Sequence, residues 1–122
     1  MKTVLVVEDD KLLGKTVCGY LEKAGYGVFW AESAKQAYEA MESQETNLIL
    51  LDIMMPDIDG FEALKHIRAS EKLRDIPVVI LSNLSDTKDM DRAMNLGATD
   101  YIVKSNIELS DLVEKIKSEY LI

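Results

Sequence analysis

Residues 47–56 read NLILLDIMMP and decide the fold. An almost wholly apolar run of this kind is typical of a strand buried on both faces of a parallel sheet, and Asp52 comes where the run ends. A second run, VLVV at residues 4–7, ends in the acidic residues 8–10. Four carboxylates at one sheet edge are costly unless a positive charge lies among them. The pattern therefore predicts a metal site with a nucleophilic or phosphate-bearing aspartate.

Short apolar segments alternate with helical patterns along the chain. This alternation predicts an α/β fold, a doubly wound parallel sheet with helices on both faces. The expected strands cover residues 3–7, 27–30, 47–51, 77–81 and 99–103. Right-handed crossovers and two helix layers leave few strand orders, and 2-1-3-4-5 is a common one for five strands.

Capping residues mark most of the expected helix ends. Ser33 and Asp59 are expected to cap the second and third helices, because a Gln or Glu follows each of them by three residues. Gly25 and Gly97 are expected to end the first and fourth helices. The start of the fifth helix is open, since Ser105 and Ser110 both resemble caps.

The predicted strand order brings several polar groups to one place. Asp9 and Asp52 would face each other across the crevice where open α/β sheets bind ligands. Ser82 follows the fourth strand and Lys104 follows the fifth. The same edge would then carry acids, a hydroxyl and an ammonium group.

Length and charge narrow the classes of function. With 122 residues the chain is expected to form a single domain. Its net charge of -8 argues against direct binding of nucleic acid or of anionic membranes. No apolar stretch approaches the roughly 20 residues of a membrane span, so we expect no membrane insertion and a cytoplasmic protein.

The expected acidic edge favours phosphoryl chemistry. Carboxylate oxygens without nearby His or Cys favour Mg²⁺, with Mn²⁺ as the alternative. Asp9 and Asp52 are expected as direct ligands, with Glu8 behind a water molecule. An aspartate oxygen can attack phosphorus and form an acyl phosphate, while Lys104 neutralises charge on the transferring oxygens and Ser82 donates a hydrogen bond.

Five motifs in order resemble the receiver domain of two-component response regulators, the CheY-like family. They are VLVVEDD at 4–10, LLDIMMPDIDG at 50–60, LS at 81–82, GATDY at 97–101 and YIVK at 101–104. The resemblance covers essentially the whole chain. It implies one receiver domain over residues 1–122, with the flavodoxin-like (βα)5 fold and the strand order predicted above.

The resemblance also implies roles for individual residues. Asp52 would accept a phosphoryl group from a histidine on a sensor histidine kinase or a histidine phosphotransfer protein. Mg²⁺ would be held by Glu8, Asp9, Asp52 and the backbone carbonyl of Met54. Lys104 would bind the phosphoryl oxygens.

A switch and an output surface are implied as well. Ser82 would also bind the phosphoryl oxygens, and its inward movement would let Tyr101 rotate from an exposed to a buried position. The fourth helix, last strand and fifth helix would then present an output surface to another protein, or to an effector domain outside this chain. The resemblance thus implies a phosphoacceptor switch, which catalyses only its own phosphorylation and dephosphorylation, rather than an enzyme.

Three other functions are compatible with parts of the sequence pattern. An aspartate-nucleophile phosphatase would carry a second acid two residues after its nucleophile, where this chain has Met54. A flavin site needs glycines and hydroxyls where residues 8–10 are acidic. A pseudo-receiver that acts without phosphorylation stays open, because Ser105 follows Lys104 where many relatives have proline after a cis peptide bond.

Overall fold

A computed structural model describes residues 1–120, except for the side chain of Ile58. Residues 121 and 122, which complete the single-domain span expected from the sequence, lie outside the described residues. The elements in chain order are β1 (Thr3–Val7), α1 (Lys11–Lys23), β2 (Gly27–Ala31), α2 (Ala34–Ser43), β3 (Leu48–Leu51), β4 (Met54–Met55), β5 (Ile58–Asp59), α3 (Gly60–Ala69), β6 (Val78–Ser82), α4 (Thr87–Asn95), β7 (Asp100–Val103), a 3₁₀ turn (Lys104–Asn106) and α5 (Leu109–Ser118).

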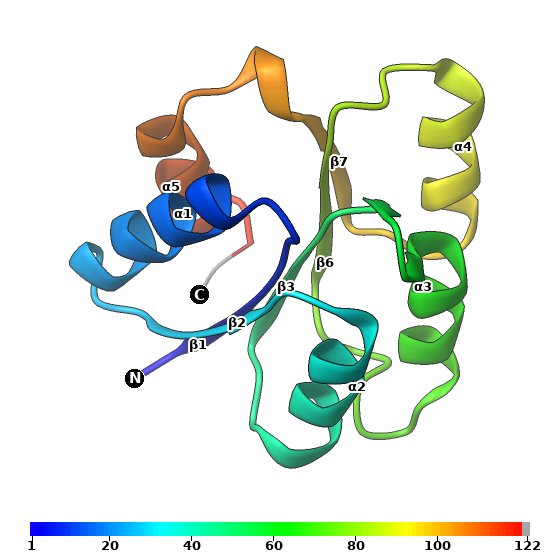
Figure 1. The fold of residues 1–122 in the computed structure, drawn as a ribbon, viewed down its shortest axis with the longest axis horizontal. Coiled ribbons are helices and arrows are strands. Elements are labelled where there is room, and N and C mark those ends of the chain that lie inside the picture. Colours follow the sequence, from blue (N-terminus) through cyan, green and yellow to red (C-terminus); the bar gives the residue numbers. More distant parts are fainter. Residues whose placement is uncertain (121–122) are drawn as a thin grey trace.

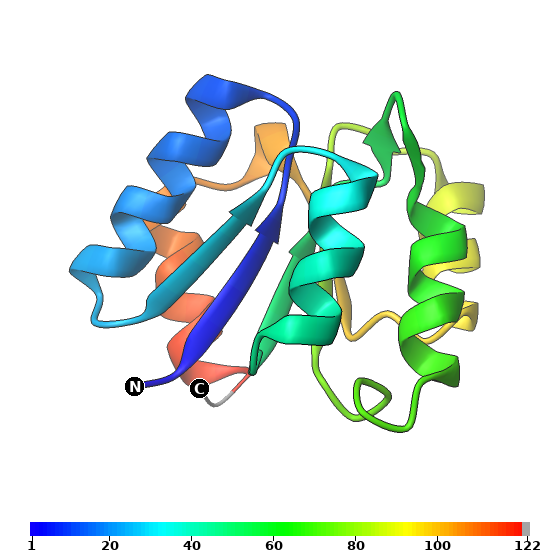
Figure 2. The same ribbon diagram turned by 60° about the horizontal axis from the view of Figure 1, so that its bottom comes forward.

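Five strands form one parallel sheet in the order β2-β1-β3-β6-β7. Counted along the chain without the short β4 and β5, this is the predicted order 2-1-3-4-5, so the flavodoxin-like prediction is confirmed. Helices α1 and α5 cover one face of the sheet, and α2, α3 and α4 cover the other (Figure 1). The arrowheads of β1 and β2 point to the same edge of the sheet (Figure 2).

The central strands are apolar because both of their faces are covered. In β3, Leu48 and Leu50 belong to the apolar cluster under α1 and α5. Ile49 and Leu51 belong to the cluster under α2, α3 and α4. Since successive side chains of a strand point to opposite faces, a strand covered on both sides needs an apolar residue at every position. Within residues 1–120, none of the helices combines the length and apolarity that crossing a membrane requires.

Most of the predicted helix ends are confirmed. Ser33 Oγ accepts from Gln36 N at 3.2 Å, and Asp59 Oδ1 accepts from the first turn of α3. Gly25 and Gly97 follow α1 and α4 with φ angles of 97° and 102°, which favour glycine.

The start of α5 differs from both sequence candidates. Glu108 is the N-cap residue of α5, and its side chain makes no capping hydrogen bond. Ser105 lies in the 3₁₀ turn that follows β7, and Ser110 lies inside α5. The turn uses the first residues after β7, so the helix begins later than a cap at Ser105 would place it.

A two-stranded hairpin of β4 and β5, which the sequence did not predict, follows Asp52. Asp57 in the hairpin loop accepts a hydrogen bond from Ala34 N at 3.0 Å, at the start of α2. The hairpin leads into α3 at Gly60, which lies directly against the segment after Asp52. A methyl group at Gly60 would lie 2.4 Å from Cα of Ile53, so only glycine permits this approach.

Replacing glycine by alanine should have opposite effects on the free energy of unfolding at Gly60 and at Gly19. Gly60→Ala should lower the free energy of unfolding by about 1–3 kcal/mol, because the added methyl group must displace the Ile53 backbone. Gly19→Ala, in α1 with no atom within 4 Å of the new methyl group, should raise it by about 0.5–1 kcal/mol. Urea denaturation measures both values. A Gly60→Ala protein as stable as the wild type would contradict the contact.

Candidate functional site

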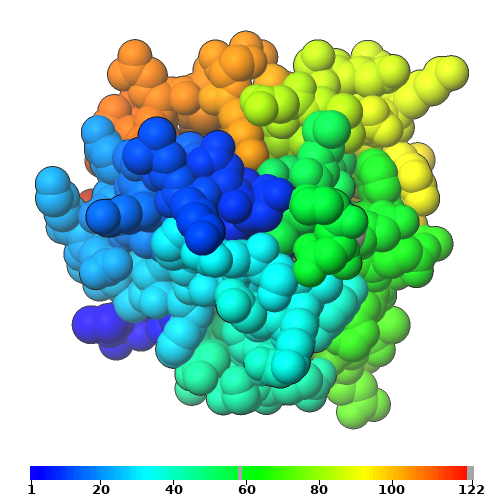
Figure 3. Space-filling view, in the orientation of Figure 1, coloured from blue at the N-terminus to red at the C-terminus, as the bar shows by residue number. Residues whose placement is uncertain are grey.

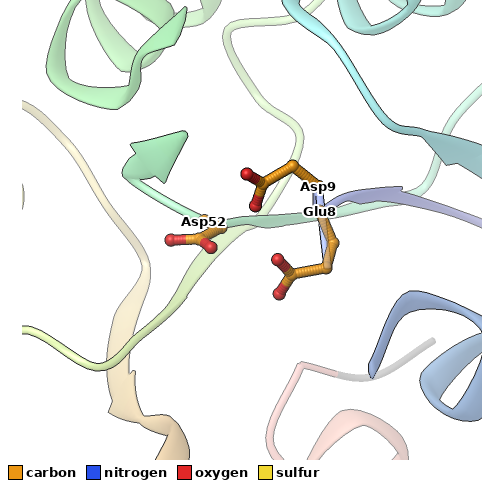
Figure 4. A group of neighbouring side chains, drawn as sticks. All are labelled: Glu8, Asp9 and Asp52. Atoms are coloured by element: carbon orange, nitrogen blue, oxygen red, sulfur yellow. The ribbon is translucent and has the colours of Figure 1, made fainter. Parts of the chain in front are cut away.

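The strand order places three carboxylates together. Val7 pairs with Leu51 in the sheet, so Glu8 and Asp52 leave β1 and β3 side by side. Asp52 N donates to Val7 O at 3.1 Å, which fixes the backbone at this point. Oxygen atoms of Glu8, Asp9 and Asp52 all lie within 4.8 Å of one another, and Figure 4 shows their carboxylates turned toward a shared space.

Lys104 supplies the positive charge that this cluster requires. It follows β7, and its Nζ lies 2.6 Å from Glu8 Oε1 and 2.9 Å from Asp52 Oδ2. The peptide bond between Lys104 and Ser105 is trans. The missing proline therefore does not keep Lys104 from the acidic residues.

The pKa values of Glu8 and Lys104 are both raised, but for different reasons. Burial raises the pKa of Glu8 to about 7, and the charge of Asp52 adds to this, although the hydrogen bond from Lys104 opposes it. Burial lowers the pKa of Lys104, but its hydrogen bonds to Glu8 and Asp52 outweigh burial, and the net shift is upward. One ammonium group thus serves two buried carboxylates, which leaves an excess of negative charge.

The residues present fit a small divalent cation. The cluster offers only carboxylate oxygens, which are the ligands that Mg²⁺ and Mn²⁺ prefer. They line an open cleft of about 250 Å³. The other lining residues are Asp10, Met54, Asn83 and Lys104. Met54 N donates to Asp52 Oδ1 at 2.9 Å, so the loop after β3 holds the carboxylate oxygen that Lys104 does not contact.

Ser82 and Tyr101 both contact the backbone of Leu84, and a hydrogen bond between their side chains opposes the upward shift that burial causes in the pKa of Tyr101. Ser82 is fully buried at the end of β6, and its Oγ accepts from Leu84 N at 3.2 Å. Tyr101 occupies a buried position, and its OH donates to Leu84 O at 2.9 Å. The residue types do not predict the contacts with Leu84, because Leu84 makes them through its backbone.

Three segments that are distant in sequence meet on the face shown in Figure 3. They are the start of α1 in blue, the hairpin after Asp52 in green and the turn after β7 in orange. The structure therefore brings together the segments that carry Glu8, Asp9, Asp52, Met54 and Lys104.

The comparisons with known proteins agree on one family. Residues 4–117 match the model of the response regulator receiver domain. The transcriptional regulatory protein CrdR of Helicobacter pylori is 38% identical over 116 residues, which are 95% of this chain and 54% of that protein. The chain thus spans about half the length of the curated relatives it matches.

Solved structures show the same fold. A CheY-like response regulator receiver domain protein from Methanospirillum hungatei JF-1 has a TM-score of 0.89 and 29% identity, over 98% of this chain and 94% of that one. The receiver domain of a sensor histidine kinase from Pseudomonas aeruginosa PAO1 has a TM-score of 0.85 and 27% identity, over 98% of this chain and 97% of that one. That structure holds a magnesium ion in its active site cleft.

The raised pKa of Glu8 predicts a pH dependence of stability. Between about pH 4.5 and 7, native Glu8 keeps a proton that the unfolded chain has lost, so the free energy of unfolding falls as pH rises. Glu8→Gln removes this component. Between about pH 4.5 and 7, the free energy of unfolding of the wild type should fall by on the order of 1–3 kcal/mol more than that of Glu8→Gln.

Urea denaturation in the presence of EDTA, from about pH 4.5 to 8, measures the effect. Glu71→Gln, at an exposed loop position, is the control and should follow the wild-type pH dependence. Parallel curves for the wild type and Glu8→Gln would contradict the raised pKa.

Proposed function

Because the chain belongs to the response regulator receiver family, we propose that it is a phosphorylation switch in which Asp52 accepts a phosphoryl group from a phosphohistidine. The observation that carries the proposal is Lys104 Nζ, 2.9 Å from Asp52 Oδ2, within a cluster of carboxylates. The proposed donor is a sensor histidine kinase or a histidine phosphotransfer protein. We place the reaction in the cytoplasm, where the ATP that supplies such donors is found, and assign it to residues 1–122 acting as one receiver domain.

The proposed transfer moves one phosphoryl group between two side chains. An Asp52 oxygen forms a bond to phosphorus as the bond from phosphorus to the donor's imidazole nitrogen breaks, and the nitrogen keeps the electron pair. The products are an acyl phosphate on Asp52 and a free histidine. Lys104 neutralises charge on the phosphoryl oxygens during the transfer. The chain thus catalyses only its own phosphorylation and dephosphorylation.

Glu8, Asp9, Asp52 and the backbone carbonyl of Met54 are the residues that would hold Mg²⁺. When bound, Mg²⁺ neutralises charge that develops on the transferring oxygens. Both Glu8 oxygens already have partners, since Oε1 pairs with Lys104 and Oε2 accepts from Asp10 N at 3.2 Å. This supports Asp9 and Asp52 as the direct carboxylate ligands, with Glu8 acting through water.

Leu84 would connect the phosphoryl group to the output surface. We propose that Ser82 Oγ leaves Leu84 N to bind a phosphoryl oxygen, which frees the residue whose carbonyl holds the Tyr101 hydroxyl. Tyr101 is already buried in this structure, and we propose that the movement of Ser82 favours this buried position over an exposed one. The charge of one covalently bound phosphoryl group would thus shift the equilibrium between two arrangements of Tyr101 and the output surface.

The proposed output surface is the face formed by α4, β7 and α5. An apolar groove of about 470 Å³ lies there, and Met90, Tyr101 and Ile107 contribute to its lining. Relatives named as transcriptional regulators are about twice as long as this chain, which supports an effector domain or output protein as the partner. The net charge of -8 supports nucleic-acid contact only through such a partner.

Intact-mass measurement tests the phosphoacceptor. With Mg²⁺ and acetyl phosphate, or with a phosphohistidine donor, the wild type should gain the mass of one phosphoryl group. Asp52→Asn should gain none, because its amide lacks the nucleophilic oxygen. Asp91→Asn, at an exposed position on α4, changes the charge equally and should behave as the wild type. No gain from any donor would favour the pseudo-receiver that acts without phosphorylation.

A serine pair tests the connection to the output surface. Ser82→Ala should still accept the phosphoryl group on Asp52, but the phosphorylation-induced amide shifts of Tyr101 and Met90 should be largely lost. Two-dimensional NMR spectra before and after addition of acetyl phosphate measure these shifts. Ser85→Ala, at an exposed position in the same loop, should keep them. Equal shifts in Ser82→Ala and the wild type would contradict the role of Ser82.

A further inference from the structure

An aromatic side chain outside the acidic cluster contacts the backbone of that cluster. Trp30, on the edge strand β2, donates its indole Nε1–H to the backbone carbonyl of Glu8 at 3.0 Å. We propose that Trp30 is a positioning residue for the metal site, because it fixes the peptide plane that joins Glu8 to Asp9. The inference rests on the proposed function, in which these residues help to hold Mg²⁺.

The peptide plane links the two acidic residues mechanically. The Glu8 carbonyl and the Asp9 N–H belong to one rigid planar unit, so a hydrogen bond to the carbonyl sets the direction in which the chain enters Asp9. Glu8 N already donates to Ala31 O at 3.0 Å. The ladder between β1 and β2 ends with the pair Val7 and Ala31, and the indole supplies a donor just beyond it.

Asp9 depends on its backbone more than the other acids do. Lys104 holds the carboxylates of Glu8 and Asp52 directly. Among the residues that the structure describes, no hydrogen bond or ion pair holds the Asp9 carboxylate. Its placement within 4.8 Å of the other acids therefore follows from the backbone that Trp30 restrains.

The indole is itself held in place by α1. A methyl group at Gly14 would lie 2.4 Å from ring atoms Cε2 and Cζ2 of Trp30, so the ring packs against the bare backbone of the helix. The ring also packs against the apolar cluster under α1 and α5. Because α1 and β2 hold the indole ring in place, its hydrogen bond restrains the peptide between Glu8 and Asp9.

Trp30 is the only tryptophan in the chain, so incorporation of a tryptophan analogue changes this residue alone. An analogue without the N–H and with a ring of similar shape therefore tests the hydrogen bond. Growth of a tryptophan auxotroph on 3-benzothienylalanine replaces the N–H with sulfur, and growth on 5-fluorotryptophan keeps the N–H as a control. Loss of a hydrogen bond that orients a metal ligand typically weakens metal binding by 10–100-fold. We expect about tenfold weaker Mg²⁺ binding in the first protein and little change in the second.

Isothermal titration with MgCl₂ and thermal melting in EDTA together decide the question. The inference requires weaker Mg²⁺ binding with a Tm close to that of the wild type. Unchanged Mg²⁺ affinity in the benzothienylalanine protein would overturn it, as would a loss of affinity matched by a large fall in Tm. If the wild type itself binds no Mg²⁺, the proposed metal site fails first, and the positioning role fails with it.

A pair of glycine variants tests the same idea with natural residues. Gly14→Ala should displace the indole ring and weaken Mg²⁺ binding, whereas Gly19→Ala on the same helix meets no atom within 4 Å and should leave it unchanged. Equal Mg²⁺ affinity in the two variants would count against the role of Trp30.

Discussion

The contact of Lys104 with two buried carboxylates is the interaction on which the site depends. Glu8 and Asp52 are only 3% and 5% exposed, and buried acids without a cation would be strongly destabilising. The ammonium group reaches both acids from the far side of β6, because parallel strands deliver their carboxyl ends to one edge. The ion pairs therefore require the whole central sheet to be in register.

The charges of these residues also explain why the site favours a divalent cation and a phosphoryl group. One ammonium and three clustered carboxylates leave a surplus of negative charge, which favours a divalent cation and, with it, a phosphoryl group. Besides Lys104, the clustered carboxylates accept hydrogen bonds from the backbone, at Met54 N and Asp10 N. Such bonds depend on loop geometry, so the loops after β1 and β3 contribute as much to the site as the acids do.

The fold was predictable because its signals are local. Apolar runs such as residues 48–51 mark strands buried on both faces, and capping residues such as Ser33 and Asp59 mark helix starts. Chain order and crossover handedness then limit the sheet to a few arrangements. By this route the candidate residues Glu8, Asp9, Asp52 and Lys104 were identified, and the structure brings them together.

The sequence alone determined the α/β class, the acidic strand ends and the family motifs, since these follow from periodicity and residue type. It also reduced the strand order to a few candidates, of which the structure has 2-1-3-4-5. Only the tertiary structure decided the hairpin after Asp52, the late start of α5 and the trans peptide bond after Lys104. The contacts of Leu84 with Ser82 and Tyr101, and of Trp30 with Glu8, also emerged only there. All three contacts use a backbone N–H or C=O as one partner. Every residue but proline carries both groups, so no residue type announces such contacts before the chain is folded.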